Sequence, residues 1–324
     1  MTTTDDIVAE VGLLIYPDCQ LAAIHGLTDL FRIANDSAAG AAEPRRAIRV
    51  SHWQSRAGEP VAAVWDSHPG APRRLTHVIA PPSIVMPERM RPMADAAAWM
   101  GARHAEGATL CSVCAGAFVL AETGLLNRRR ATTHWAFAEA LARRYPEIDL
   151  ATEKMVIDDG DIMTAGGIFA WTDLGLMLVE RFMGPGVMLA TARFLLVDPP
   201  RRDQSVFRAF IPKFDHGEAA ILRAQHHLHA NPAEAHGIPD LAARAGLSER
   251  TFLRRFARAT GLRPSEYLRQ VRVMKARGAL ELTGDSVDQI AWSVGYSDPA
   301  AFRKAFQKIT GLTPALYRRR FGLG

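Results

Sequence analysis

The sequence SVDQIAWSVGYSDPAAFRKAF, residues 286–306, decides the fold of the C-terminal third of the chain. Its apolar residues recur at intervals of three and four, the spacing of one buried helix face, until Gly295, which suits the left-handed position that ends a helix. Ser286 and Gln289 have the spacing of a capping box, and Asp298, followed by proline, fits the first turn of a second helix. The segment therefore predicts two helices joined by a short turn, which is the helix-turn-helix layout.

The same scaffold occurs once before, 49 to 50 residues upstream. The repeated positions are mostly apolar residues, glycines and prolines: Ile238, Leu241, Ala242, Ala245, Gly246, Ser248, Phe252, Phe256, Gly261, Leu262, Pro264 and Tyr267 return as Val287, Ile290, Ala291, Val294, Gly295, Ser297, Phe302, Phe306, Gly311, Leu312, Pro314 and Tyr317. Ser248 and Ser297 stand where a short oxygen side chain can cap the second helix of each copy. The outward positions differ, so the two copies present two different surfaces.

Residues 265–282, between the copies, predict one long helix that acts as a rigid spacer. Its buried side is expected to consist of Tyr267, Leu268, Val271, Met274 and Leu282.

Charge separates this third of the chain from the rest. Residues 217–324 carry 17 Lys and Arg against nine Asp and Glu, whereas residues 1–216 carry 22 against 25. The excess cations gather on the second helix of each copy and at residues 318–320. Any small helical repeat would give the apolar pattern, but a basic face confined to the repeat indicates a polyanion partner.

The C-terminal third resembles the AraC family of bacterial transcription regulators over residues 220–321. The resemblance rests on GALELT from Gly278, on the segment quoted above and on GLTPALYR from Gly311. It implies that both second helices enter successive major-groove segments on one face of the duplex, about 34 Å apart. The base-contacting positions that it implies are Arg250, Leu253, Arg254, Pro299, Ala300, Arg303 and Lys304.

The side chains at these positions differ in what they can read. Arg250 and Arg254 can make bidentate contacts to guanine, and Leu253 can pack on a thymine methyl. Pro299 and Ala300 have little to read with, so the second copy is expected to discriminate bases less. The expected phosphate contacts, which position without specifying, are Arg255, Arg258, Lys308, Arg318, Arg319 and Arg320. A solvated surface charge is the open alternative for each arginine.

The 324 residues suffice for two domains, expected at residues 1–197 and 217–324 with a linker at 198–216. The helix-turn-helix motifs are expected at 238–260 and 287–310. No run approaches 18 apolar residues, and the N-terminus lacks the layout of a signal peptide. Three cysteines argue against a disulfide framework. The protein is therefore expected in the cytoplasm, without a membrane partner.

The N-terminal region alternates short apolar runs with helical patterns. Strands are predicted at 8–16, 48–53, 61–64, 77–80, 108–113, 154–157 and 161–164, and helices at 21–34, 89–104, 115–122, 134–144 and 171–182. This alternation predicts an α/β domain with a parallel sheet covered on both faces. Ligand sites in such folds lie at the carboxyl ends of the strands.

One such strand end lies in TLCSVCAGAFVLA, residues 109–121, where an apolar strand runs into Cys114 and a helix begins at once. A cysteine at that turn can be held in a sharp elbow, where the helix N-terminus lowers its pKa. The motif resembles the cysteine elbow of the PfpI/ThiJ superfamily, whose flavodoxin-like parallel sheet is related to class I glutamine amidotransferases. GLLNRRRATTHW from Gly124 narrows the resemblance, over residues 7–210, to GlxA-type regulators, which fuse such a domain to an AraC-type reader.

The catalytic pattern of that superfamily is incomplete in this chain. Its hydrolases place a histidine directly after the cysteine, where this chain has Ala115, and related hydratases use an acid where it has Ala23. Pro81 and Pro82 replace the glycine pair that can form an anion-holding nest. The resemblance therefore implies a non-catalytic domain, with Cys114 as the only candidate nucleophile.

The ligand pocket is expected at this elbow. The residues expected to line it are Cys114, Ala115, Gly116, His25 and His134.

No metal or cofactor site is expected. Cys111 and Cys114 form one C-x-x-C pair, without the second pair or spaced histidine of a zinc site. His226, His227 and His229 include no i, i+4 pair, so they predict a polar helix face.

These patterns predict a sequence-specific transcription regulator whose sheet domain dimerises and binds a small metabolite. The resemblance points to amino acids or quaternary amines, and an amine would need an aromatic cage. The tryptophans available for a cage are Trp53, Trp65, Trp135 and Trp171. The expected partners are promoter DNA, the effector, a second copy of the chain and RNA polymerase. Two alternatives stay open: a hydrolase or hydratase that uses Cys114 and carries a DNA-binding domain, and a sheet domain that only dimerises.

Overall fold

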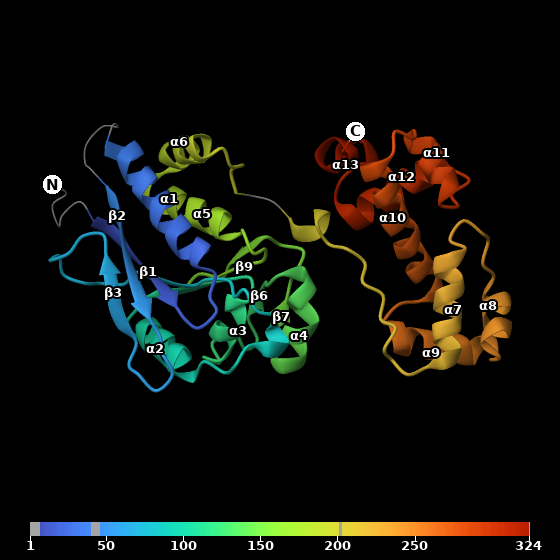
Figure 1. Cartoon of the computed structure of the whole chain (residues 1–324), viewed down its shortest axis with the longest axis horizontal. Coiled ribbons are helices and arrows are strands. Elements are labelled where there is room, and N and C mark those ends of the chain that lie inside the picture. The colour runs from blue at the N-terminus through green and yellow to red at the C-terminus, as the bar shows by residue number, and fades with distance from the viewer. Residues whose placement is uncertain (1–6, 40–45, 201–202, 324) are drawn as a thin grey trace. The chain divides into compact units, whose positions relative to one another are not determined.

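The computed structural model describes residues 7–39, 46–200 and 203–323. The chain divides into two compact units, Met1–Gln204 and Ser205–Gly324, and the division falls inside the predicted linker (Figure 1). Linker residues 201–202 lie outside the described residues. The first unit is an α/β domain and the second is helical, so the predicted fold class is confirmed.

The first unit is built on a seven-stranded sheet of order β3-β2-β1-β4-β5-β9-β8. Its strands are β1 (Ile7–Ile15), β2 (Ala47–Gln54), β3 (Ala62–Asp66), β4 (His77–Ala80), β5 (Thr109–Val113), β8 (Val156–Asp158) and β9 (Ile162–Ala165). The strands from β2 to β9 in this order pair in parallel, whereas the edge strands β3 and β8 pair antiparallel with their neighbours. Every residue of β4 and β9 is buried, as expected of parallel strands covered on both faces.

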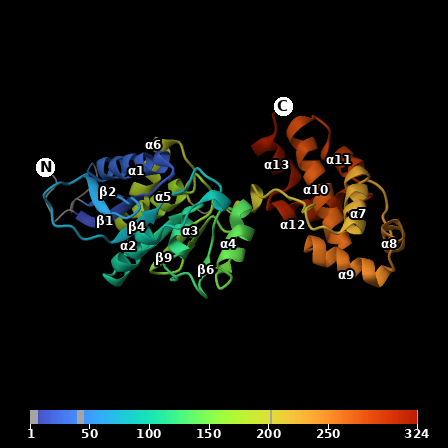
Figure 2. The same cartoon turned by 60° about the horizontal axis from the view of Figure 1, so that its bottom comes forward.

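Helices cover both faces of this sheet (Figures 1 and 2). On one face α1 (Leu21–Ala39), α5 (Trp171–Met183) and α6 (Pro185–Leu195) pack together, and on the other lie α2 (Ala94–Ala105) and α3 (Gly116–Ala121). The remaining short elements are β6 (Arg130–Ala131), α4 (Ala138–Arg144) and β7 (Asp149–Leu150). The elbow between β5 and α3 lies at the carboxyl end of the central strands, where the sequence predicted a site.

Two helices differ from their predictions. The helix expected from Arg89 begins at Ala94, because Pro92 disfavours helical backbone at the residue before it; residues 87–89 form one separate 3₁₀ turn. The sequence patterns did not predict α6. It is separated from α5 by Gly184, whose φ of 86° is a conformation that glycine adopts readily.

The second unit repeats one helical arrangement twice. Its helices are α7 (Ala219–Ala230), α8 (Ile238–Ala245), α9 (Glu249–Thr260), α10 (Pro264–Leu282), α11 (Val287–Ser293), α12 (Pro299–Thr310) and α13 (Pro314–Phe321). The pairs α8–α9 and α11–α12 are the two predicted helix-turn-helix motifs, and α10 joins them. Within the described ranges, no helix combines the length and apolar character needed to cross a bilayer.

Each copy of the repeat has its own hydrophobic core, and α10 contributes to both. The aromatic triplets at the two centres are Phe252, Phe256 and Tyr267 in the first core, and Phe302, Phe306 and Tyr317 in the second. Successive ring centroids lie 5.3 to 5.6 Å apart in both triplets. Such aromatic pairs stabilise a core beyond the area that they bury. The repeat in the sequence is thus a repeat of core packing.

The buried side of α10 differs in part from the prediction. Tyr267 and Val271 are buried as expected, but Leu282 is 72% exposed because the helix ends there. The residues buried in the second half of α10 are Val273, Ala276 and Leu280.

The helix caps also differ between prediction and structure. Asp298, not Ser297, caps α12, because its carboxylate accepts hydrogen bonds from two backbone N–H groups of the first turn, at 2.8 and 3.2 Å. Ser248 occupies the N-cap position of α9, but its hydroxyl donates to Thr251. The carboxylate places a negative charge at the start of α12, which favours that helix end.

Candidate functional site

The second helix of the first motif, α9, presents a basic face to solvent. Phe252 and Phe256 point into the core, so the residues between them point outward. Arg250, Leu253 and Arg254 are exposed, and Leu253 keeps 39% of its surface accessible. Neither arginine is held by a hydrogen bond or ion pair to another described residue. Both guanidinium groups are therefore free to contact a partner.

The second helix of the second motif, α12, presents a different face. Of the residues predicted to contact bases here, Ala300, Arg303 and Lys304 are exposed and Pro299 is half-buried. Arg303 forms an ion pair with Asp288 on α11. A base would have to compete with that carboxylate, and the Asp298 cap adds a second negative charge at the start of the helix. The two motifs therefore differ in electrostatics as well as in side chains.

Two of the predicted phosphate contacts are held by Glu218, the residue before α7. Nε of Arg255 lies 2.9 Å from one carboxylate oxygen of Glu218, and Arg258 pairs with the other oxygen. Arg255, and to a lesser degree Arg258, holds the pKa of Glu218 below its usual value. Arg258 keeps 71% of its side chain exposed and Arg255 32%, so both remain accessible to a competing phosphate.

The remaining predicted phosphate contacts have different surroundings. Arg318 donates to two backbone oxygens, at 3.3 and 2.5 Å, and so fastens α13 to the end of α10 and the loop after it. Arg320 lies over the ring of Phe207, 5.2 Å from its centroid. Lys308 and Arg319 are exposed and have no such partner among the described residues. They are the freer cations of this set.

The loop between α7 and α8 braces the two motifs against each other. Arg272 on α10 donates to the backbone oxygens of Pro232, at 2.8 Å, and Glu234, at 3.0 Å. In the turn of the second motif Gly295 has a φ of 92°, and a Cβ there would lie 2.6 Å from the Cα of Ala233. Only glycine fits both the conformation and the approach. These contacts hold the loop that leads into the first motif against α10 and against the turn of the second motif.

The predicted cysteine elbow is present at the end of β5. Cys114 has a φ of 54°, in the left-handed region that non-glycine residues rarely adopt, and its N–H donates to the backbone oxygen of Ala165 at 2.8 Å. A Cβ on Gly116 would lie 2.3 Å from the backbone oxygen of Ala80. The first turn of α3 can therefore approach β4 only because residue 116 is glycine.

The thiol at this elbow is buried. Burial raises the pKa of Cys114 to about 12, and the N–H of Ala115 offsets this only in part. The N–H at the start of α3 thus lowers this pKa as expected, but desolvation outweighs it and the net shift is upward. No hydrogen bond to the described residues supplies the thiol with a base.

The structure does not join the two predicted pocket histidines to the elbow by hydrogen bonds. The ring of His25 is exposed on α1 and lies 6.0 Å from that of His52, and the ring of His134 packs on Trp135, 5.4 Å away. Cys114, Ala115 and Gly116 are buried. Besides Ala165, Thr133 bonds to the elbow, since its hydroxyl donates to the Cys114 backbone oxygen at 2.8 Å. A pocket at these residues stays a prediction.

Sequence reasoning missed Gln204, the last residue of the first unit. Its side chain is 2% exposed, and its amide nitrogen donates to the hydroxyl of Thr132 and to the backbone oxygens of Thr133 and Lys154, at 2.8 to 3.1 Å. Its amide oxygen accepts from the N–H of Trp135 at 3.2 Å. Thr133 also bonds to the elbow, so Gln204 is one residue removed from Cys114 in the hydrogen-bond network.

The next residues belong to the second unit. The backbone oxygen of Ser205 lies 3.5 Å from the guanidinium of Arg277, which also donates to the backbone oxygen of Arg208. Phe207 packs on the ring of Phe321, 5.7 Å away. The residues on either side of the 204–205 peptide bond are therefore each fixed in their own unit.

Comparison with known proteins assigns both units. Residues 78–181 match the DJ-1/PfpI family, and residues 241–320 match a helix-turn-helix domain family. The chain is 28% identical to the HTH-type transcriptional regulator GlxA of Rhizobium meliloti (67% of this chain and 67% of the relative). It is 31% identical to the HTH-type transcriptional regulator ArgR of Pseudomonas aeruginosa (64% and 63%).

A third relative, the isonitrile hydratase of Pseudomonas putida, matches a shorter region: it is 38% identical over 25% of this chain and 34% of its own length. The chain thus spans about two thirds of the length of the regulators that it matches. The chain thus carries a DJ-1/PfpI domain followed by a helix-turn-helix domain, and over about two thirds of its length it is similar to HTH-type transcriptional regulators that include GlxA and ArgR.

Proposed function

We propose that this protein regulates transcription by reading promoter DNA with α9 and α12. The observation that carries the proposal is the pair of motifs, the first of which exposes Arg250 and Arg254 with no hydrogen-bond or ion-pair partner among the described residues. A dimer formed through the α/β domain would double the readable site and set the arrangement of its half-sites. Since the partner is chromosomal DNA, the proposed site of action is the cytoplasm.

Selection from sheared genomic DNA, followed by footprinting, tests this proposal. Specific sites should bind about 10³-fold or more tightly than random DNA, at salt from about 50 to 200 mM. Arg254→Ala should lose preference at one position, whereas Arg193→Ala on α6, an exposed arginine of the other unit, should not. Uniform binding that responds only to salt would reduce the helical unit to a polyanion anchor.

We infer that a small metabolite bound by the α/β domain controls this binding. The inference is supported by two hydrogen bonds, in which Gln204 donates to the backbone oxygen of Thr133 and the Thr133 hydroxyl donates to the backbone oxygen of Cys114, because they connect the end of the first unit to the elbow. Thermal melts with panels of amino acids and quaternary amines test it, because a ligand of the native state raises the midpoint. If no compound shifts the melt or alters DNA binding, the domain serves only for dimerisation.

The α/β domain acts without catalysis in this proposal. The buried Cys114 thiol with its raised pKa, and the alanines at positions 23 and 115, support that view. Native protein should therefore react with iodoacetamide at Cys114 far more slowly than a free thiol at neutral pH. Rapid alkylation at this residue would revive the cysteine-enzyme alternative.

A further inference from the structure

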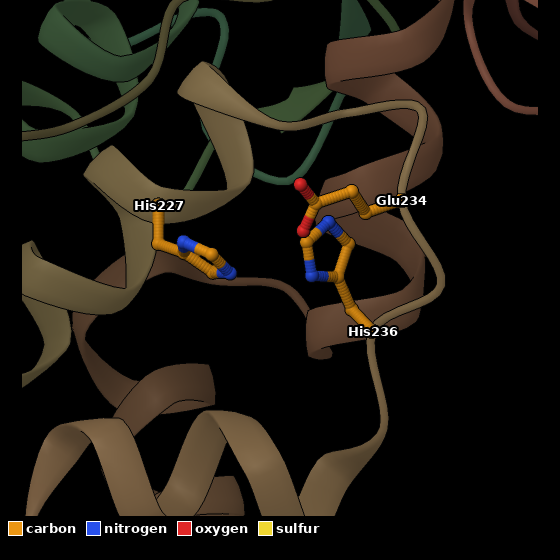
Figure 3. A group of neighbouring side chains, drawn as sticks. All are labelled: His227, Glu234 and His236. Atoms are coloured by element: carbon orange, nitrogen blue, oxygen red, sulfur yellow. The ribbon is translucent and has the colours of Figure 1, made fainter.

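Three metal-ligating side chains meet where α7 ends, outside every site described above (Figure 3). His227 lies in the last turn of α7, and Glu234 and His236 lie in the loop that leads to α8. One donor atom from each lies within 4.8 Å of the other two. Both histidines are half-buried and Glu234 is exposed. The sequence prediction missed this group because two of its members lie in a loop, beyond the helix face.

One residue, Asn231, orients both imidazole rings. Nε2 of His236 lies 2.7 Å from the Asn231 backbone oxygen. A carbonyl oxygen only accepts, so Nε2 carries the proton and Nδ1 keeps a free lone pair. The Asn231 side-chain nitrogen lies 3.1 Å from Nδ1 of His227 and, as placed, donates to it; His227 can ligate through Nε2 once this amide turns so that its oxygen accepts from Nδ1–H. The two rings are 5.1 Å apart at 85°. The His236 bond, in which the ring donates to a carbonyl oxygen, is of the kind that fixes ligand histidines in metal sites.

The loop that carries two of the three side chains is itself held in place. Arg272 binds the backbone oxygens of Pro232 and Glu234, and Ala233 packs against Gly295. The carboxylate of Glu234, by contrast, is exposed and makes no hydrogen bond to a described residue. The backbone is thus fixed while the carboxylate can still turn toward an ion.

We propose that His227, Glu234 and His236 bind one divalent transition-metal ion of the zinc class. Two imidazoles and one carboxylate form a donor set that zinc uses in sites with an open fourth position. Ligand atoms around tetrahedral zinc lie about 3.4 Å apart, so the three side chains need to close by roughly 1 Å. His236 also lines a cavity of about 300 Å³.

The ion would join the end of α7 to the loop that braces the second motif. Binding would hold Glu234 and His236 against α7, and through Ala233 it would stiffen the contact with Gly295. The expected effect is a more stable helical unit, since an ion that binds only the folded chain raises its melting temperature. The ion would not itself touch DNA.

Zinc binding to the full chain, first stripped with a chelator, tests the proposal. Titration against a chromophoric zinc chelator should show one ion per chain, and cobalt should give the visible spectrum of a tetrahedral site. His227→Ala and Glu234→Gln should each weaken zinc binding by about 10-fold or more. Glu234→Gln changes only an exposed loop carboxylate, so it separates ligand loss from misfolding. His226→Ala, on the same helix but exposed and outside the group, should bind zinc like the native chain.

The proposal is overturned by either of two results. One is native protein that takes up no stoichiometric zinc. The other is zinc uptake that is equal in the native chain, His227→Ala and Glu234→Gln, which would mark adventitious binding to surface histidines. Neither measurement uses DNA, so the outcome is independent of the proposed regulatory function.

Discussion

Glu218, the residue before α7, pairs with Arg255 on α9, whose Nε lies 2.9 Å from a carboxylate oxygen. The same carboxylate also pairs with Arg258. One acid therefore occupies two of the cations that the sequence predicted for phosphates. A ready intramolecular partner lowers the gain from binding phosphate, because the ion pairs must first be broken. Glu218 thus neutralises part of the positive charge that the helical unit can offer to DNA.

Glu218→Gln should therefore tighten DNA binding and steepen its salt dependence. Each additional phosphate contact adds about −0.9 to the slope of log K against log salt, so two released arginines should add up to about −1.8. Binding measured at four or more salt concentrations checks this. Glu249→Gln removes the same charge from α9 without an arginine partner among the described residues. Equal slopes for the two variants would show that bulk charge alone is at work.

The two motifs should contribute unequally to specificity. Arg254→Ala removes a free guanidinium, so it should cost about 1–3 kcal/mol of specific binding and relax one base position. Arg303→Ala removes one that Asp288 already holds, and should cost less. Competition binding with single-base operator variants measures both. A larger loss for Arg303→Ala would show that DNA displaces Asp288 at little cost.

Gln204→Ala should destabilise the α/β domain by about 1–3 kcal/mol, because the hydroxyl of Thr132 and the backbone oxygens of Thr133 and Lys154, here called the socket, lose their buried donor. Any effector response should weaken as well, while DNA affinity without effector stays near the native value. Asp203→Ala is the matched control, since it removes an exposed ion pair with Lys154 that is worth little. Chemical denaturation of both variants decides. Equal stabilities would mean that the socket does not hold the chain.

The stability of the protein should fall as pH drops from about 6.5 toward 4. Burial lowers the pKa of His77 to about 4, so the folded chain keeps this ring neutral while the unfolded chain takes up a proton from about pH 6.5 downward. The neutral His77 therefore contributes its full stability above that range, and the free energy of unfolding falls by about 3 kcal/mol across the range from this group. Melting curves from pH 7.5 to 4 should show the loss, and His77→Leu should reduce it. An unchanged profile in the variant would assign the pH dependence to other groups.

The repeat made the helical unit easy to predict, because glycine, proline and apolar spacing are local signals that packing does not override. Asp298 shows the limit at one residue. Ser297 and Asp298 can both cap, and only the backbone path decides which side chain reaches the free N–H groups. Leu282 shows a similar limit at a helix end: its apolar side chain fits the pattern of a buried face, but the core ends at Leu280 and Leu282 is exposed.

The sites were harder to predict than the fold because they depend on residues distant in sequence. The elbow at Cys114 could be located from a strand followed by Ala-Gly-Ala, yet its pKa depends on burial that only the folded chain defines. Glu218 lies 37 residues before Arg255, and no spacing rule connects them. Gln204 lies among prolines and arginines, where a buried amide has no local signature.

The peptide bond between Gln204 and Ser205 also bears on how such fusions evolve. A sensor domain exchanged between relatives would need to bring the socket of Thr132 and Thr133 together with the glutamine that fills it. An insertion at residues 198–200 would precede both attachments and leave them intact. An insertion after Gln204 would separate the residue held in the first unit from the residues held in the second. Selection would then conserve both the glutamine and the absence of extra residues between it and Ser205.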